Sequence, residues 1–347
     1  MTGVVVIGAI LLQQCKPNDI LFMVNQERRM AAETYRLDGR VILITGAGRG
    51  LGESYARHLA DLGAQVIVND LGAGMADGEG SPLPARRVAE AIRAAGGRAS
   101  DDMSDIANPR EAEALVERIV EVHGRIDALV NNAGNFLPPA PFAETALADF
   151  ERTWRIHLGG TYNLCRAALP HMTGQGFGRI VNTISTQGLY GGVGTAAYAS
   201  AKAAVQGLTA SLAADHRGSD VRINAISPGA FTRMVDAGER PAAFTEALKR
   251  NLPADLVAPA VAWLCHPGCA ENGALIQAMS GWFSRTIIGD LDGFWDFAPS
   301  IDSVARGLAA LPATGPVRAA DSSAAHAQSI IARAEAARAH SQEKKIS

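Results

Sequence analysis

Cysteine is scarce in this chain of 347 residues, which has only Cys15, Cys165, Cys265 and Cys269. Four scattered cysteines are too few for a disulfide framework and are typical of a reducing compartment, so we expect a cytoplasmic protein. Two of them frame the run Cys265–Cys269, but no second pair of ligands stands elsewhere at a metal-site spacing. We therefore predict no metal site and interpret this run as the end of a helix.

Charge of one sign and long apolar runs are lacking as well. The formal net charge is -3 and acidic and basic residues are interspersed, which argues against nucleic acid or an anionic membrane as a partner. The apolar stretch Val4–Leu12 is far shorter than the ~20 residues that span a bilayer. No Lys or Arg precedes it as in a secretory signal. The expected partner is a small molecule.

The chain does contain a regular alternation of short β-branched runs and longer amphipathic stretches, beginning at Arg40. Such an alternation predicts a parallel sheet covered by helices on both faces, that is, a doubly wound, Rossmann-like three-layer α/β/α domain. The predicted strands are Val41–Thr45, Gln65–Asn69, Ala128–Asn131, Arg179–Thr183 and Val221–Ile226. The predicted helices are Leu51–Leu62, Pro109–His123, Leu147–Met172 and Tyr198–His216.

This domain is expected to span residues 37–282, with an extension at each end. Residues 1–36 are expected to be poorly ordered, and residues 1–29 precede Met30 and either form a true extension or reflect an over-long translation start. The segment 283–347 is expected to be partly helical, with a helix over 321–347. Because Leu71–Pro84 is rich in glycine and proline, it predicts a surface loop near the cofactor end of the sheet.

The glycine-rich run Thr45–Gly52 follows a predicted strand and opens a predicted helix. Without Cβ atoms this turn can approach a pyrophosphate, and the free N–H groups of the helix start can bind it. Asp70 ends the second strand about twenty residues later, where a carboxylate accepts hydrogen bonds from both ribose hydroxyls and repels a 2′-phosphate. This favours NAD over NADP, although Arg49 in the loop offers a guanidinium for the extra phosphate.

Ser185, Tyr198 and Lys202 form a proton-transfer pattern. The phenol precedes the lysine by four residues, one helical turn, and follows the hydroxyl by thirteen. Only five of the 32 basic residues are lysines, so this chain uses arginine for most of its positive charges. A lysine at position 202 therefore suggests that arginine cannot take its place there.

Four motifs in this order resemble the short-chain dehydrogenase/reductase family: Thr45–Gly52, Asn131–Gly134, Ser185 and Tyr198-x-x-x-Lys202. The resemblance implies that Asn131–Gly134 steadies the central sheet beside the cofactor and that Pro228-Gly229 begins a loop over the nicotinamide. It further implies a homodimer or homotetramer built on the two long helices. The implied cofactor-binding residues are Gly46, Arg49, Gly50, Leu51, Gly52, Asp70, Asn132, Ala133, Gly134, Tyr198, Lys202, Pro228 and Gly229.

Within the family the chain resembles the (3R)-hydroxyacyl-CoA dehydrogenase domains of peroxisomal multifunctional enzymes, for example in Val68–Gly72 and Glu271–Gly273. His157 stands where many family members have an asparagine that holds a water linking the lysine to solvent. A proton relay and a structural role are both open for it. Thr232 falls one residue short of the common family spacing for a contact with the nicotinamide carboxamide.

The expected mechanism makes Tyr198 the general base, with its pKa lowered by Lys202, while Ser185 binds the substrate oxygen. The expected activity is NAD-dependent hydride transfer between a secondary alcohol and its ketone, as in a (3R)-3-hydroxyacyl-CoA dehydrogenase. Alternatives are a hydroxysteroid or other lipophilic-alcohol dehydrogenase, an NADPH-dependent 3-ketoacyl reductase and, outside enzymes, a nucleotide-sensing binding protein. The segments Phe231–Leu252 and Thr186–Ala196 are expected to form a lid and an apolar wall that suit an acyl chain or a ring system.

Overall fold

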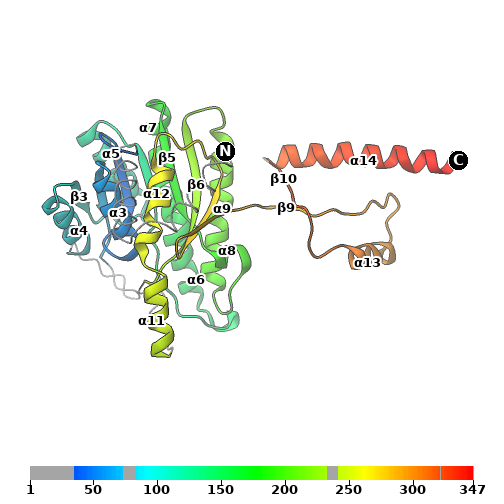
Figure 1. Cartoon of the computed structure of the whole chain (residues 1–347), viewed down its shortest axis with the longest axis horizontal. Helices are drawn as coiled ribbons and strands as arrows, with labels where there is room; N and C mark the ends of the chain where they lie inside the picture. Colours follow the sequence, from blue (N-terminus) through cyan, green and yellow to red (C-terminus); the bar gives the residue numbers. More distant parts are fainter. Residues whose placement is uncertain (1–34, 73–82, 233–240, 321, 347) are drawn as a thin grey trace, which may run out of the picture. The chain divides into compact units, whose positions relative to one another are not determined.

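The computed structural model of the chain describes residues 35–72, 83–232, 241–320 and 322–346. The chain forms two compact units, Met1–Ser284 and Arg285–Ser347. The first unit is a three-layer arrangement in which helices cover both faces of a central sheet (Figure 1).

The sheet has eight strands in the order β3-β2-β1-β4-β5-β6-β7-β8. Neighbouring strands from β3 to β7 are parallel, with Thr45 of β1 opposite Asn69 of β2 and Ile44 opposite Val130 of β4. The order reverses direction between β1 and β4, which opens a crevice at the carboxyl ends of these strands. The strands are β1 (Val41–Thr45), β2 (Gln65–Asn69), β3 (Arg98–Asp102), β4 (Ala128–Asn131), β5 (Gly178–Thr183), β6 (Val221–Gly229), β7 (Leu275–Met279) and β8 (Trp282–Thr286).

Helices of the first unit pack on the two faces of the sheet. They are α3 (Gly50–Asp61), α4 (Leu83–Ala94), α5 (Pro109–His123), α6 (Leu147–Trp154), α7 (Gly160–Gly174), α8 (Thr186–Tyr190), α9 (Ala196–Asp215), α11 (Ala242–Asn251) and α12 (Ala258–Cys265). A π-helical turn η2 (Arg155–Gly159) joins α6 to α7, and short 3₁₀ turns occupy Phe142–Glu144 and Ala254–Leu256.

The alternation of side chains along β1 explains the two cores. Ile42 and Ile44 point to one face, where they join the cluster that contains residues of α3, α4 and α12. Val41 and Leu43 point to the other face, where they join residues of α5 and α7. Both faces are buried, so the strand is apolar at almost every position, as expected for a parallel sheet.

Helix α5 shows why some predicted boundaries agree with the structure. The side chain of Asn108 caps it by accepting a hydrogen bond from the amide of Arg110 at 3.1 Å. Pro109 occupies the first turn, and Gly124 ends the helix in the left-handed region with φ 74°. The predicted α/β fold is confirmed, and β1, β2, β4 and α5 have the predicted bounds.

Other predicted elements differ from the structure. The predicted helix 147–172 is made of α6, the π-helical turn and α7, because hydrogen bonding changes at Arg155–Gly159. The last two residues of the predicted loop 71–84 begin α4, and residues 73–82 lie outside the described residues. Strand β3 was not predicted because its sequence, RASDD, has no apolar alternation, and it lies at the sheet edge.

The second unit contains helices α13 (Ile301–Ala310) and α14 (Ser323–Ile346) and a two-stranded sheet of β9 (Gly289–Asp290) and β10 (Arg318–Ala319). None of its residues whose side chains the structure describes is buried. Instead, Arg333 and Arg338 lie over the rings of Trp295 and Phe297, at 5.8 and 4.1 Å from the ring centroids. The helix predicted over 321–347 is present as α14.

Candidate active site

The glycine loop between β1 and α3 lies at the crevice where the strand order reverses. Gly46 and Gly50 adopt φ +61° and +54°, a region that favours glycine. A Cβ on Gly46 would lie 2.8 Å from the Cα of Ala133, and one on Gly52 would lie 2.2 Å from the carbonyl oxygen of Gly46. Side chains at these positions would fill the cradle, so the loop fits a closely approaching pyrophosphate at the start of α3.

Residues that follow β4 hold this loop in place. The hydroxyl of Thr45 accepts hydrogen bonds from the amides of Asn132 and Ala133, each at 3.0 Å. The Asn132 side-chain amide donates to the carbonyl oxygens of Thr45 and Gly46 at 2.9 and 3.2 Å. The sequence did not single out Thr45 for this role, although its position at the strand end before the first glycine was visible.

Asp70 lies beside the same loop, at the end of β2. Its Oδ2 accepts a hydrogen bond from the amide of Gly48 at 2.9 Å, and its Oδ1 accepts one from the amide of Gly72 at 2.7 Å. These bonds place a carboxylate beside the glycine loop. Arg49 precedes the first residue of α3, and it lines a pocket of about 420 Å³ together with residues of α4. Leu51 is half-buried and its side chain packs against the core. Only its backbone is therefore available to a ligand in the cradle.

Ser185, Tyr198 and Lys202 are brought together by the packing of α8 on α9. Ser185 follows β5 and caps α8, and its hydroxyl accepts a hydrogen bond from the amide of Gln187 at 3.2 Å. A Cβ on Gly188 would lie 2.9 Å from the Cβ of Lys202, so only glycine allows this close approach of the two helices. Ser185 also shares a side-chain hydrogen bond with Tyr198.

Burial sets the protonation of Tyr198 and Lys202. It raises the pKa of Tyr198, and the hydrogen bond with Ser185 only partly offsets this. It lowers the pKa of Lys202 to about 7. The Lys202 ammonium donates to the carbonyl oxygen of Thr183 at 2.7 Å and lies 5.8 Å from the centroid of the Tyr198 ring. The net shift of the Tyr198 pKa is therefore upward, because burial dominates, whereas the sequence predicted a lowering by Lys202.

His157 lies in the π-helical turn and contacts the same phenol. Its ring meets the Tyr198 ring edge-on, and its Nε2 lies 3.2 Å from the carbonyl oxygen of Asn135. A Cβ on Gly134 would lie 2.2 Å from Cε1 of His157, so this glycine is required by the histidine ring. Burial, followed by the positive charge of Lys202, lowers the pKa of His157 well below its ordinary value, while the bond to Asn135 acts in the opposite direction. A relay that needs a charged imidazole at neutral pH is thus disfavoured.

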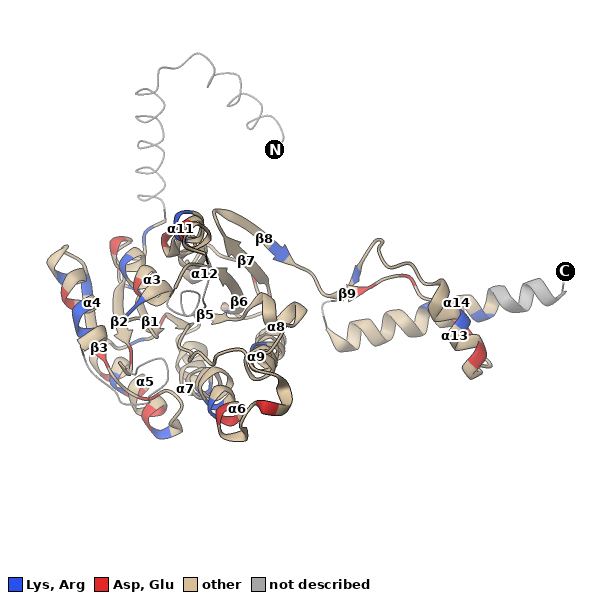
Figure 2. Ribbon diagram, turned by 90° about the horizontal axis from the view of Figure 1, so that it is seen from below, with Lys and Arg blue, Asp and Glu red and all other residues tan. Residues whose placement is uncertain are grey.

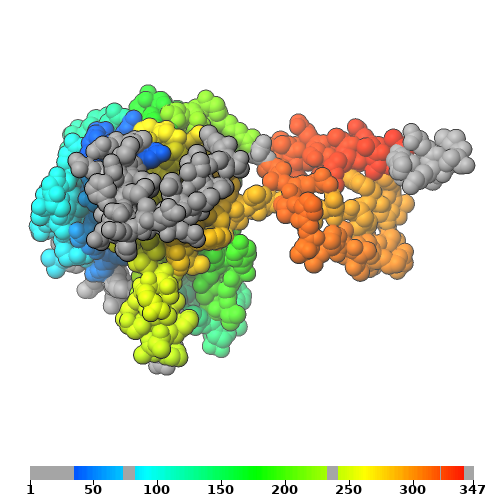
Figure 3. Space-filling view, in the orientation of Figure 1, coloured from blue at the N-terminus to red at the C-terminus, as the bar shows by residue number. Residues whose placement is uncertain are grey.

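Pro228 and Gly229 end β6 on the side of the crevice. A Cβ on Gly229 would lie 2.4 Å from the Met279 side chain, so glycine lets β6 and β7 approach there. The methyl group of Thr232 would lie 3.5 Å from a Cβ on Gly50, which places the start of the predicted lid beside the glycine loop. Residues 233–240 of that lid lie outside the described residues. Its helix α11, yellow-green in Figure 3, stands out from the surface and has no buried residue.

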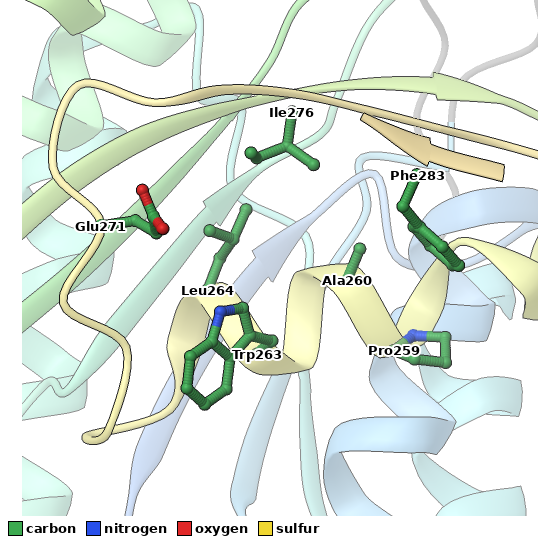
Figure 4. Close-up of a pocket in the computed structure, with 7 residues that line it drawn as sticks. All are labelled: Pro259, Ala260, Trp263, Leu264, Glu271, Ile276 and Phe283. Carbon is green, nitrogen blue, oxygen red and sulfur yellow. The ribbon is translucent and has the colours of Figure 1, made fainter. Parts of the chain in front are cut away.

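A second pocket contains none of the predicted site residues. It has a volume of about 320 Å³ and is largely apolar (Figure 4). Its lining residues come from α12, β7 and β8 and the segment between α12 and β7: Pro259, Ala260, Trp263, Leu264, Glu271, Ile276 and Phe283.

The described residues show no dominance of one sign of charge along the first unit (Figure 2). Basic and acidic residues are interspersed along the first unit (Figure 2). Within the described part of the chain, no helix is long and apolar enough to cross a membrane. The same residues include no group of three or more His, Cys, Asp or Glu side chains arranged to hold a metal ion.

The short chain dehydrogenase family model matches residues 40–241. Peroxisomal multifunctional enzyme type 2 from Mus musculus is 42% identical over 255 residues, which are 73% of this chain and 33% of that protein. The full-length peroxisomal multifunctional enzyme type 2 from Drosophila melanogaster matches with a TM-score of 0.70 and 30% identity, over 86% of this chain and 50% of that one. A 7α-hydroxysteroid dehydrogenase complexed with NADH and 7-oxo glycochenodeoxycholic acid matches with a TM-score of 0.64 and 31% identity, over 71% and 95%.

The chain therefore belongs to the short-chain dehydrogenase family. It is an oxidoreductase that acts on CH–OH groups, with a nucleotide-binding Rossmann fold. It spans about a third to a half of the length of the curated relatives that match it first.

Proposed function

We propose that this protein is an NAD-dependent dehydrogenase of (3R)-3-hydroxyacyl thioesters. The observation that carries the proposal is the meeting of Ser185, Tyr198 and Lys202 at the carboxyl end of β5, on the same sheet edge as the glycine loop. The likeness to the mouse and fruit-fly multifunctional enzymes, together with the resemblance of motifs to their dehydrogenase domains, supports the substrate class.

Tyr198 and Ser185 handle the substrate oxygen in this proposal. Ser185 donates a hydrogen bond to the carbinol oxygen and orients it, and Tyr198 removes its proton as general base. When bound, the oxidised nicotinamide supplies the hydride acceptor and a positive charge that favours the phenolate. Because the pKa of Lys202 is about 7, its neutral amine is available near neutral pH to accept the proton that Tyr198 has taken from the substrate, which restores the phenolate between turnovers.

The cofactor side of the proposal assigns a role to each neighbouring group. The cradle of Gly46, Gly50 and Gly52 receives the pyrophosphate at the start of α3. Asp70 accepts from the ribose hydroxyls in place of the amides of Gly48 and Gly72, and its charge disfavours NADP. Lys202 binds the nicotinamide ribose, and the end of β6 at Pro228-Gly229 borders the nicotinamide.

The walls of the proposed substrate site favour an apolar chain. Tyr190 and Val193, which follow Ser185 along the chain, are 71% and 99% exposed, so two apolar side chains remain available to a ligand. This feature suits a steroid as well as an acyl chain, and the likeness to a 7α-hydroxysteroid dehydrogenase makes a hydroxysteroid the second candidate. An NADPH-dependent 3-ketoacyl reductase and a non-catalytic nucleotide sensor are the remaining alternatives.

The test is turnover of purified protein with (3R)-3-hydroxybutyryl-CoA and NAD, followed by absorbance of the reduced nicotinamide, beside a hydroxysteroid and NADP. Tyr198→Phe should lower kcat by about a hundredfold or more while leaving the Kd for NAD unchanged. The matched control is Tyr162→Phe, since Tyr162 is exposed on α7. If only the hydroxysteroid reduces NAD, the proposed substrate is wrong and a hydroxysteroid takes its place. Cofactor binding without turnover of any alcohol would favour the nucleotide-sensing binding protein.

Assembly and location belong to the same proposal. We expect a homodimer or homotetramer, which is supported by the exposed apolar side chains of the second unit, such as Ile301 at 93% and Leu308 at 59%. Light scattering of the full chain tests this, and a monomer would contradict it. A cytoplasmic location remains our expectation, whereas the first relatives are named peroxisomal, and fractionation of the source cells would distinguish the two.

A further inference from the structure

An arginine-rich pocket adjoins the ribose end of the proposed cofactor site. Its volume is about 420 Å³, and it is lined by Arg49, Leu83, Pro84, Arg86, Arg87 and Glu90. A Cβ on Gly48 would lie 2.6 Å from the Cβ of Pro84 and 2.8 Å from Oδ2 of Asp70. Gly48 therefore lies between the wall of the pocket and the carboxylate. Guanidinium groups are the side chains best suited to a phosphate. The three arginines of the pocket would favour a 2′-phosphate, whereas the proposed function requires that NADP binds less well than NAD.

Arg87 makes three hydrogen bonds to Glu53 and Gly48. Its Nη2 donates to Oε2 of Glu53 at 2.6 Å and to the carbonyl oxygen of Gly48 at 3.0 Å, and its Nη1 donates to Oε1 of Glu53 at 3.2 Å. Glu53 is in the first turn of α3, and Oε1 also accepts two hydrogen bonds from Arg57, at 2.8 and 3.1 Å. The Glu53 carboxylate thus links Arg87, which belongs to α4, to helix α3.

The protonation states agree with this pairing. Burial works against the charge on Glu53, but hydrogen bonds from Arg87 and Arg57 outweigh it and lower the pKa of the carboxyl. The hydrogen bond to Glu53 in turn raises the pKa of Arg87. Both groups are charged at neutral pH, and the negative charge of Glu53 offsets the positive charge that Arg87 brings to the pocket.

We propose that Glu53 determines cofactor specificity by occupying N–H groups of Arg87 that would otherwise bind a 2′-phosphate on the adenosine ribose. This inference rests on the proposed function, in which Asp70 receives the ribose hydroxyls. Asp70 repels a 2′-phosphate directly, whereas Glu53 engages one of the three guanidinium groups that line the pocket. Without the Glu53 carboxylate, Arg87 retains its bond to Gly48 and gains a free edge toward the pocket.

The experiment measures the Kd of 2′,5′-ADP and of 5′-AMP by calorimetry on the full chain, since neither probe requires turnover. In Glu53→Gln the affinity for 2′,5′-ADP relative to 5′-AMP should rise by about tenfold, the size of one added charge-assisted hydrogen bond. Adding Arg87→Met to this variant should return the ratio to the wild-type value. Glu90→Gln is the matched control, because it removes the same charge from the same pocket and should leave the ratio within about twofold.

Arg87→Met alone provides a second test in case Glu53→Gln unfolds. Because Arg87 is engaged in the wild type, this substitution should leave the ratio unchanged. A selective loss of 2′,5′-ADP binding would show that Arg87 already serves the 2′-phosphate and would overturn the inference. An unchanged ratio in folded Glu53→Gln, or an equal rise in Glu90→Gln, would overturn it too. Failure of both probes to bind would instead overturn the proposed cofactor site on which the inference depends.

Discussion

The ring of His157 meets the ring of Tyr198 edge-on, with centroids 5.1 Å apart and an interplanar angle of 85°. His157 is 2% exposed, and its pKa is lowered by burial and by the charge of Lys202. A neutral, buried imidazole in this position fixes the orientation of the phenol. The π-helical turn that carries it interrupts a long helix, a feature that often marks functional sites.

Removing the imidazole should change the acid stability of the protein. In the wild type, the free energy of unfolding should fall as the pH drops from 6.5 to 5, because the unfolded chain binds protons that folded His157 does not. His157→Phe retains a ring against Tyr198 and should lose part of this fall, while kcat drops by about tenfold through disturbed positioning. Urea unfolding at the two pH values measures the first effect. An identical pH dependence in wild type and variant would contradict burial of a neutral His157.

Gly134 should be intolerant of even one methyl group. Its Cβ would lie 2.2 Å from Cε1 of His157, a contact that forces the ring or the loop to move. Gly134→Ala should lower stability by about 1–3 kcal/mol and reduce kcat. Gly207→Ala in α9 is the control, because a Cβ there would meet nothing within 4 Å. It should stabilise the protein by about 0.5–1 kcal/mol. Equal thermal stability of the two variants would argue against the contact.

Lys202 should make stability depend on pH on the alkaline side of neutrality. Its pKa is about 7 in the folded protein. In the unfolded chain a lysine has a pKa of about 10.4, so the unfolded state binds the extra proton between these values. The free energy of unfolding should then rise from pH 7 to 8.5, by at most about 1.4 kcal/mol per pH unit. Lys202→Met should abolish the rise. A rise of the same size in the variant would assign it to other groups.

Arg179 should be the most costly arginine to replace. It is 1% exposed in β5 and donates to Asp220 Oδ1 and to the carbonyl oxygens of Gly178, Asp220, His266 and Pro267. Arg179→Met leaves these acceptors without their donor and should destabilise the protein by about 3–5 kcal/mol. Denaturant unfolding would measure the loss. Arg217→Met, at an exposed position, should cost less than about 0.5 kcal/mol, and a similar cost for both would contradict the structural role.

The parts of the site that depend on neighbouring residues were visible in the sequence. Glycines at fixed offsets after a strand, and a lysine one turn after Tyr198, are local patterns. Short apolar runs also predicted β1, β2 and β4, because these strands are buried on both faces and nearly every position needs an apolar side chain. Strand β3 carries no such signal, since its residues are polar and lie at the edge of the sheet.

Contacts between distant residues were decided by the tertiary structure. Arg87 reaches Gly48 across 39 positions and Glu53 across 34, so no spacing rule links them. The low pKa of Lys202 follows from burial, which a sequence motif does not encode. The sequence by itself determined five central strands of the sheet, the glycine loop and the identity of the chemical groups, because these follow from local periodicity and backbone freedom. The protonation, the ring packing of His157 and the engagement of Arg87 arise only when packing removes water and brings separate segments within hydrogen-bonding distance.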